Sequence, residues 1–311
     1  EIDLIEEVAR LYGYDKIPVS MPSVSVSSIE KSLTGVIEDR IRAVLTGFGY
    51  SEIITYSFVS PEGADLLNFS HDDERRQMVK IRNPLTEDQS VMRTNLVYSI
   101  LKTMKTNTYS GCFDLKIFEM GRTFYHKNEG SLPREKNRVG GLLTGHRYDD
   151  SWHFDDLQAD FYDLKGCIEG LFDSLKIRNV SYSAHVPGPF LHPGRACNIS
   201  VNNVNLGWMG EIHPDVIKKM DLRNRAMAFE IDMDLLSEIY SVKIGFDEIS
   251  KFPSSSRDVA FLVKVELEAE KIVTLSKGLG EELLEKVSIF DVYDGKGIPE
   301  DDIPLIFEKF Y

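Results

Sequence analysis

The chain has 311 residues, of which 42% are hydrophobic and 28% are charged, so it is long enough for two domains with a sizeable core. Its formal net charge is −14, from 36 basic and 50 acidic residues. This balance excludes a protein that wraps nucleic acid through bulk positive charge, and any contact with RNA would need a local patch.

The cysteines and the apolar runs indicate in which cell compartment the protein is expected. Cys112, Cys167 and Cys197 are odd in number, far apart and not in metal spacing, which indicates buried thiols in a reducing compartment. No apolar run reaches membrane-spanning length and no signal peptide is recognisable, so we expect a cytoplasmic protein without membrane contact. The chain opens on Glu1 in the middle of a helical pattern, and we expect it to be a piece of something longer.

Residues 3–14 are predicted to form a helix, with an apolar face and a stop at Gly13. Asp3, Glu6, Glu7 and Arg10 fall at helical spacing and form one polar stripe. Two interpretations stay open for this stripe. It is either a solvated helix face or a magnesium site, because clustered carboxylate oxygens suit a hard cation.

A linker and a second helix follow. Residues 21–28 are rich in Ser and Val with Pro18 and Pro22 nearby, which indicates a domain boundary. Apolar residues keep a 3.6-residue period from Ile29 to Phe48 and predict a helix of five turns. The β-branched and aromatic run from Glu52 to Phe58 predicts a strand.

The most distinctive stretch is residues 83–104, NPLTEDQSVMRTNLVYSILKTM. It opens with an Asn-Pro turn and a dense polar segment. Arg93 and Thr94 then precede apolar residues at helical spacing from Leu96 to Met104, which predict a packed helix.

The middle of the chain is predicted to alternate between strands and a helix. Strands are expected at 115–120 and 139–144, with a turn at Gly121-Arg122 and a loop over 126–138. Trp152 and His153 open a further loop, and we interpret this pair as packing. An amphipathic helix is expected from residue 161 to 175.

Residues 190–214, FLHPGRACNISVNNVNLGWMGEIHP, predict a hairpin. Asn202-Asn203 lies between two alternating runs, and Asn tolerates the positive φ of a tight turn. His192 and His213 are each followed by Pro, and no carboxylate or cysteine stands at ligand spacing, so we interpret them as structural. Short helices at 214–220 and 233–240 flank a predicted strand at 227–231.

The last segment begins with residues 251–263, KFPSSSRDVAFLV. Residues 257–263 predict a strand, 268–284 a helix and 287–293 a second strand. The chain then reads EDDIPLIFEKFY, which has helical rather than strand signals.

Three of these stretches together resemble the beta subunit of bacterial phenylalanyl-tRNA synthetases: residues 83–104, 190–214 and 251–263. The segment DLIEEVARLYGYDKIP near the start is similar to the end of that family's B5 domain. The resemblance implies an α+β fold, with a class II aminoacyl-tRNA synthetase-like antiparallel sheet flanked by helices and then a truncated ferredoxin-like domain. It divides the chain into 1–22 (end of B5 and linker), 23–245 (non-catalytic core) and 246–311 (partial anticodon-binding domain).

The resemblance also implies a role, partners and sites. The core would scaffold a catalytic alpha subunit, which uses ATP, and would help to position tRNA(Phe) within an α2β2 assembly. Mg²⁺, shared with the alpha subunit, would bind Asp3, Glu6 and Glu7. Phe252, Ser256 and Arg257 would lie near RNA; the alternative is that Phe252 is core and Arg257 caps a sheet edge.

The same resemblance bears on catalysis and assembly. We expect no catalytic residues in this chain, and the resemblance makes Arg93 structural, paired with Glu87 or Asp88. The helix from Ile29 and the strand after it are similar to the first class II motif, which builds subunit interfaces. The alternative is a helix simply packed on a sheet.

The resemblance fails at the end of the chain. Residues 291–311, DVYDGKGIPEDDIPLIFEKFY, are similar instead to a glycine box of histidine-kinase-type ATPases, but the other glycine loop of such a pocket has no counterpart. Two further hypotheses therefore stay open beside the scaffold. They are a binding or regulatory module that reuses the fold, and a chimeric fragment that folds in its core alone.

Overall fold

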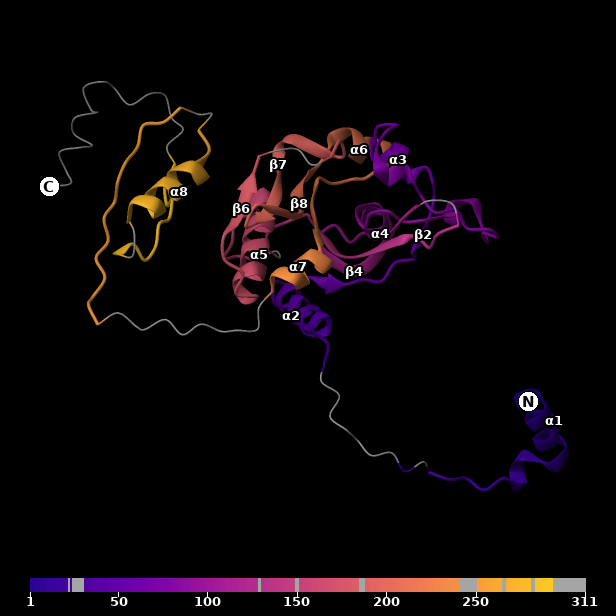
Figure 1. Ribbon diagram of the computed structural model, residues 1–311. Helices are drawn as coiled ribbons and strands as arrows, with labels where there is room; N and C mark the ends of the chain where they lie inside the picture. The colour runs from indigo at the N-terminus through magenta and orange to yellow at the C-terminus, as the bar shows by residue number, and fades with distance from the viewer. Residues whose placement is uncertain are drawn as a thin grey trace, which may run out of the picture.

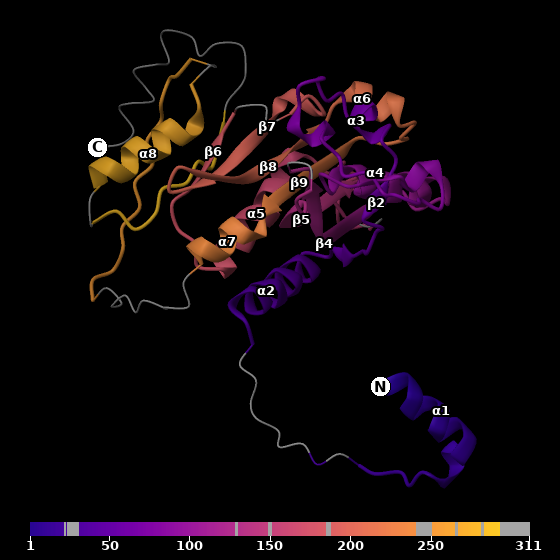
Figure 2. The same cartoon turned by 45° about the vertical axis from the view of Figure 1, so that its right-hand side comes forward.

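The computed structural model describes residues 1–21, 23, 31–127, 130–148, 151–184, 188–240, 251–264, 267–280 and 283–292. Its body is a seven-stranded sheet with helices on both faces, as Figures 1 and 2 show from two sides. The prediction of an α+β fold built on a large, mostly antiparallel sheet is confirmed.

The strands lie in the order β1-β4-β5-β9-β8-β7-β6. Every neighbouring pair is antiparallel except β1 and β4, which are parallel. Their bounds, in chain order, are Ser51–Glu52 (β1), Leu115–Tyr125 (β4), Arg134–Thr144 (β5), Val180–Ser183 (β6), Leu191–Val201 (β7), Val204–Ile212 (β8) and Ala226–Asp232 (β9). Two short strands, β2 (Phe58–Val59) and β3 (Val91–Met92), form a separate antiparallel pair.

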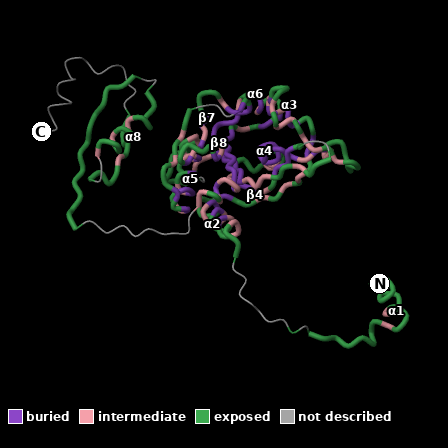
Figure 3. Tube along the Cα trace, viewed as in Figure 1, coloured by how far each residue is buried: buried purple, intermediate pink, exposed green. Residues whose placement is uncertain are grey.

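Alternate side chains of the strands belong to two hydrophobic clusters, one on each face of the sheet. Phe118 and Leu143 pack with α2 (Leu33–Gly47), α5 (Phe161–Ser174) and α7 (Met233–Ile239). Ile117 and Leu142 face the other way, toward α4 (Val97–Tyr109), α3 (Gly63–Leu66) and α6 (Pro214–Lys219). The buried trace in Figure 3 is concentrated in this layered body.

The terminal helices contribute nothing to either cluster. Helix α1 (Ile2–Tyr12), followed by the 3-10 turn η1 (Tyr14–Lys16), contains no buried residue, and neither does α8 (Ala269–Gly280). Helix α1 lies away from the sheet in Figures 1 and 2. Among the described residues, the helices are all too short or too polar to cross a membrane.

The helices predicted from periodicity are confirmed, with small shifts at their ends. Helix α2 begins at Leu33, where the Ser32 hydroxyl accepts a hydrogen bond from the Gly35 amide at 3.2 Å. Residues 24–30, which include the predicted linker and helix start, lie outside the described residues.

The Asn202-Asn203 hairpin is also confirmed. Both residues have positive φ, 49° and 66°, and they join β7 to β8. Asparagine is tolerated in this left-handed region, and the geometry is that of the tight turns that match strand twist.

Two predictions about β4 and β5 are wrong. Gly121-Arg122 is not a turn, because β4 runs through it and pairs Gly121 with Arg138. The predicted loop over 126–138 is therefore shorter, since β5 starts at Arg134. The glycine is required in mid-strand for packing: a Cβ at Gly121 would lie 2.2 Å from Arg93 Nη2.

The predicted strand from Glu52 to Phe58 is wrong in its middle. Residues 51–52 pair with β4 and residues 58–59 with β3, while the residues between them are extended without a ladder. Their polar groups bond elsewhere. The Thr55 amide donates to the Glu119 carboxylate at 3.3 Å, and Ser57 O accepts from the Arg93 amide at 2.9 Å.

The strand predicted at 257–263 is not formed, and residues 287–292 are not a strand either. A strand needs a hydrogen-bonded neighbour, and within the described ranges this segment has none to pair with. The helix predicted between them is present as α8. Tyr293 and the atypical tail lie outside the described residues.

Candidate functional site

The most distinctive stretch of the sequence anchors α4 to the sheet. It forms the 3-10 turn η3 (Glu87–Gln89), then β3, and then a loop that leads into α4. Arg93 in that loop is almost fully buried, and its Nη1 lies 2.8 Å from Oε1 of the equally buried Glu119 on β4. The prediction that Arg93 pairs with Glu87 or Asp88 is wrong, because both of these acids are exposed on the turn.

Arg93 makes two further hydrogen bonds. Nε donates to Arg122 O at 2.9 Å and Nη1 to Thr55 Oγ1 at 2.9 Å. The Thr55 hydroxyl in turn donates to Glu119 Oε2 at 2.7 Å. A buried ion pair is stable only when its other polar groups are satisfied in this way. Arg93 is therefore fixed as a structural tie between three segments, as the sequence resemblance implied.

A second buried acid holds the start of α4. Glu230 on β9 accepts a hydrogen bond from the Leu96 amide at 2.7 Å, where the helix begins. Arg138 on β5 lies 3.9 Å from Glu230 and 3.4 Å from Asp232. Burial opposes the charge of Arg138, but Glu230, Tyr125 and Asp232 together outweigh it and raise the pKa of Arg138 above the ordinary value.

A third buried acid joins two pieces of the 190–214 signature. Glu211 accepts from Arg195 Nη1 at 2.8 Å, and from Arg225 Nε and Nη2 at 2.8 and 2.9 Å. Burial pushes the pKa of Glu211 up, but the hydrogen bonds and charges of Arg225 and Arg195 prevail and lower it. The signature is thus a framework that braces β7 against β8.

The two histidines of this signature have backbone roles. His213 Nδ1 accepts from the Asp215 amide at 3.1 Å and caps α6, and His192 Nδ1 accepts from the Gly194 amide at 3.1 Å. These contacts agree with the structural interpretation made from the sequence.

The acids that stabilise this framework were missed by sequence reasoning. Glu119 and Glu211 each stand alone within an apolar strand, in LKIFEM and WMGEI, and Glu230 shares the apolar segment AFEID with Asp232. A lone acid at a buried strand position is the signal that was available, since a buried charge is kept when it has a partner.

Asp3, Glu6 and Glu7, the predicted magnesium ligands, all lie on the exposed helix α1. Their oxygen chemistry fits a hard cation. Glu7 is engaged with Arg10, whose Nη2 lies 2.5 Å from Glu7 Oε2. Across the described ranges, no three His, Cys, Asp or Glu side chains are grouped to hold a metal ion. A bound ion would need further ligands from outside these residues.

Phe252, Ser256 and Arg257, the predicted RNA-contacting residues, lie together on an extended, exposed segment. Phe252 is 82% exposed, so the alternative that it belongs to a core is wrong. Arg257 Nη1 donates to Ser256 O at 2.8 Å, so it caps no sheet edge here. The three side chains are accessible, as contact with RNA would require.

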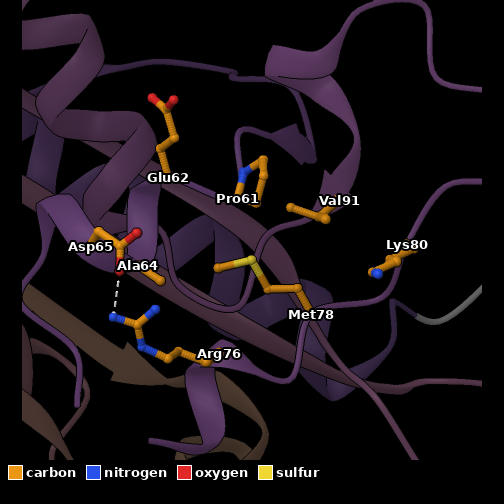
Figure 4. A pocket seen from close by; sticks show the side chains of 8 residues that line it. All are labelled: Pro61, Glu62, Ala64, Asp65, Arg76, Met78, Lys80 and Val91. Atoms are coloured by element: carbon orange, nitrogen blue, oxygen red, sulfur yellow. Dashed lines mark hydrogen bonds and ion pairs between the residues drawn. The ribbon is translucent and has the colours of Figure 1, made fainter. Parts of the chain in front are cut away.

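A surface hollow of about 390 Å³ lies between α3 and β3 (Figure 4). It is lined by Pro61, Glu62, Ala64, Asp65, Arg76, Met78, Lys80 and Val91. Arg76 Nη2 binds Asp65 Oδ1 at 2.6 Å across one side of it. The Asp65 carboxylate and the Arg76 guanidinium are thus paired with each other. We therefore interpret the hollow as a gap between packed elements and not as a binding site.

A row of exposed apolar side chains runs along the segment between β1 and β2. Ile54 is 94% exposed and Tyr56 73% exposed, and the half-exposed Phe58 continues the row. Thr55 between them points inward to Glu119. Because alternate residues of an extended segment face opposite ways, the inward Thr55 fixes the segment while the outward residues form an exposed apolar row.

The fold is that of an aminoacyl-tRNA synthetase domain. The solved pyrrolysyl-tRNA synthetase of Desulfitobacterium hafniense has the same fold over 65% of this chain and 67% of its own, with a TM-score of 0.51 and 10% sequence identity. Residues 17–233 match the family described as the phenylalanyl tRNA synthetase beta chain CLM domain, and residues 250–311 match the ferredoxin-fold anticodon binding domain. The chain belongs to the phenylalanyl-tRNA synthetase beta chain family.

Two of the relatives with a similar sequence are phenylalanine–tRNA ligase beta subunits. The phenylalanine–tRNA ligase beta subunit of Syntrophus aciditrophicus is 49% identical over 300 residues, which are 96% of this chain and 37% of that protein. The beta subunit of Syntrophotalea carbinolica is 41% identical over 313 residues, which cover 100% of this chain and 39% of that protein. The chain thus spans well under half the length of these relatives.

Proposed function

We propose that this chain is the C-terminal part of a phenylalanine–tRNA ligase beta subunit and serves as a non-catalytic scaffold. In this role it binds the catalytic alpha subunit in the cytoplasm and helps to position tRNA(Phe) for ATP-dependent aminoacylation. Family membership supports the assignment. The alpha subunit supplies the ATP chemistry, and the intact assembly is α2β2.

The observation that carries the proposal is the apolar row of Ile54, Tyr56 and Phe58. Contact between these large apolar side chains and water is unfavourable in a monomer. Such a row is typical of a surface that a partner protein covers. The segment follows α2, at the place where class II synthetases build subunit interfaces. The buried acids and arginines, by contrast, are engaged with one another and are suited to support rather than to catalysis.

Two sites accompany this scaffold. Mg²⁺ is held by Asp3, Glu6 and Glu7 together with ligands from the alpha subunit, which would supply the oxygens that α1 lacks. The accessible trio of Phe252, Ser256 and Arg257 contacts the tRNA, with the phenyl ring for stacking and the guanidinium for phosphate.

The test is size-exclusion chromatography with light scattering of the chain mixed with a bacterial phenylalanine–tRNA ligase alpha subunit. We expect a co-eluting hetero-oligomer, and we expect Ile54→Asp with Tyr56→Asp to weaken it by about tenfold or more. Leu132→Asp, at an equally exposed apolar position between β4 and β5, is the matched control and should have no effect. Separate elution of the unaltered chain and the alpha subunit would refute this role for the apolar row of Ile54, Tyr56 and Phe58. An equal loss of binding in the Leu132→Asp control would refute it as well.

A further inference from the structure

An exposed aromatic cluster lies on the loop between β5 and α5, and neither the core nor the proposed scaffold surface uses it. Its members are Tyr148, Trp152, His153 and Phe154. The Tyr148 and Phe154 rings are stacked at 4.3 Å between centroids, and His153 meets Phe154 and Trp152 edge to face at 5.0 and 5.4 Å. The sequence interpretation of Trp152 and His153 as packing is wrong for Trp152, which is 97% exposed.

Hydrogen bonds join the two ends of the loop and thereby fix the backbone that carries the aromatic cluster. The Arg147 amide donates to Leu157 O at 2.8 Å and the Ala159 amide to Gly145 O at 2.9 Å. His146 lies between two carboxylates, 2.8 Å from Asp114 and 3.1 Å from Asp156. A surface held in place before a partner arrives loses less entropy on binding.

The charge around the cluster selects the partner. Residues 151–157, SWHFDDL, contain Asp155 and Asp156 and no Lys or Arg. Phosphate groups are repelled by such a surface, which disfavours RNA although bases stack well on aromatic rings. An arginine or lysine side chain is attracted both by the ring faces, best by Trp, and by the two carboxylates that follow Phe154 in the chain.

We propose that the aromatic cluster, with Asp155 and Asp156, is a docking site for an arginine-bearing segment of another protein. A guanidinium lies against the Trp152 or Phe154 ring and faces Asp155 and Asp156, which are both exposed and follow Phe154 directly in the chain. The exposed tryptophan then has the role of a binding hot spot. This proposal does not rest on the scaffold function and concerns other residues than the apolar row of Ile54, Tyr56 and Phe58.

The chain carries its own reporter for this site. It has two tryptophans, of which Trp152 is exposed and Trp208 is 8% exposed. Acrylamide quenching of tryptophan emission therefore measures access to Trp152. We expect a hexa-arginine peptide to protect Trp152 from acrylamide, and we expect hexaglutamate and an oligouridylate RNA to give no protection. Protection by either of these instead would overturn the proposal.

Variants separate this site from the general acidity of the protein. With a fluorescently labelled hexa-arginine peptide, Trp152→Ala should weaken binding by about fivefold through loss of the cation–π contact. Asp155→Asn should also weaken it, while Glu62→Gln, which changes the net charge equally on another exposed surface, should leave it unchanged. Equal weakening by these two variants, or none by Trp152→Ala, would refute the docking site. Because all these side chains are exposed, circular dichroism should show the same fold for each variant.

Discussion

The ion pair between Arg93 and Glu119 shows how single residues tie the most distinctive sequence stretch to the sheet. Both side chains are almost fully buried and joined at 2.8 Å, with Thr55 as a third member. The sequence suggested that Arg93 is structural, but it offered no way to find a partner 26 residues away on another element. Nearby acids were the natural expectation, whereas pairing across a sheet is decided by the fold.

Removal of one member of this pair should cost far more than removal of both. Arg93→Leu leaves the Glu119 carboxylate buried without a counter-charge, and we expect a loss of about 3–5 kcal/mol in the free energy of unfolding. The double variant Arg93→Leu with Glu119→Leu should recover most of that loss. Urea denaturation of the three proteins measures this difference. Additive losses would contradict a coupled pair.

Glu211 predicts an acid-dependent loss of stability. Its pKa is lowered in the folded protein, so its contribution is fully present above the ordinary value of 4.5 and is lost as the pH falls through the lower, folded pKa. Glu211→Gln should therefore be less stable than the unaltered chain at pH 7, with a smaller gap near pH 3. Thermal unfolding across this range measures the gap, and a gap independent of pH would refute the assignment.

At the scale of elements, sequence periodicity located the helices and the hairpin better than it located strand ends. Helices α2, α4 and α5 follow from apolar spacing, because one face of each must reach a hydrophobic cluster. Gly121 misled the prediction of β4, since glycine punctuates turns but here makes room for Arg93. The segment after β1 misled it as well, because the Thr55 amide bonds the Glu119 side chain rather than the backbone of a neighbouring strand.

The β7–β8 hairpin should be sensitive to the residue at its second turn position. Asn203 has a φ of 66°, a conformation that costs a β-branched residue about 1–2 kcal/mol. Asn203→Val should destabilise the protein by that amount, while Asn203→Gly, which adopts positive φ freely, should be close to neutral. Chemical denaturation would distinguish the two. A similar cost for both variants would point to a lost side-chain contact instead of backbone strain.

At the scale of the whole molecule, stability is concentrated in one body. The buried members of both hydrophobic clusters lie between Ile37 and Leu236, while α1 and α8 contain no buried residue. The fold class was predictable because helical and strand periods alternate through this region. The predicted sites on α1 and on residues 252–257 lie outside it, and the structure leaves both exposed.

A shortened protein tests this distribution directly. Residues 31–240 retain every buried side chain of the two clusters, so removal of the flanking segments exposes no described core surface. We therefore expect this fragment to unfold cooperatively at the same urea midpoint as the full chain, with a smaller denaturant dependence at most. A fragment that starts after α2, at residue 49, should be strongly destabilised, because it lacks Ile37, Ile41 and Leu45 from the core. If the 31–240 fragment were as unstable as that control, the terminal helices would contribute to the core, and the scaffold could not be treated as an independent folding unit.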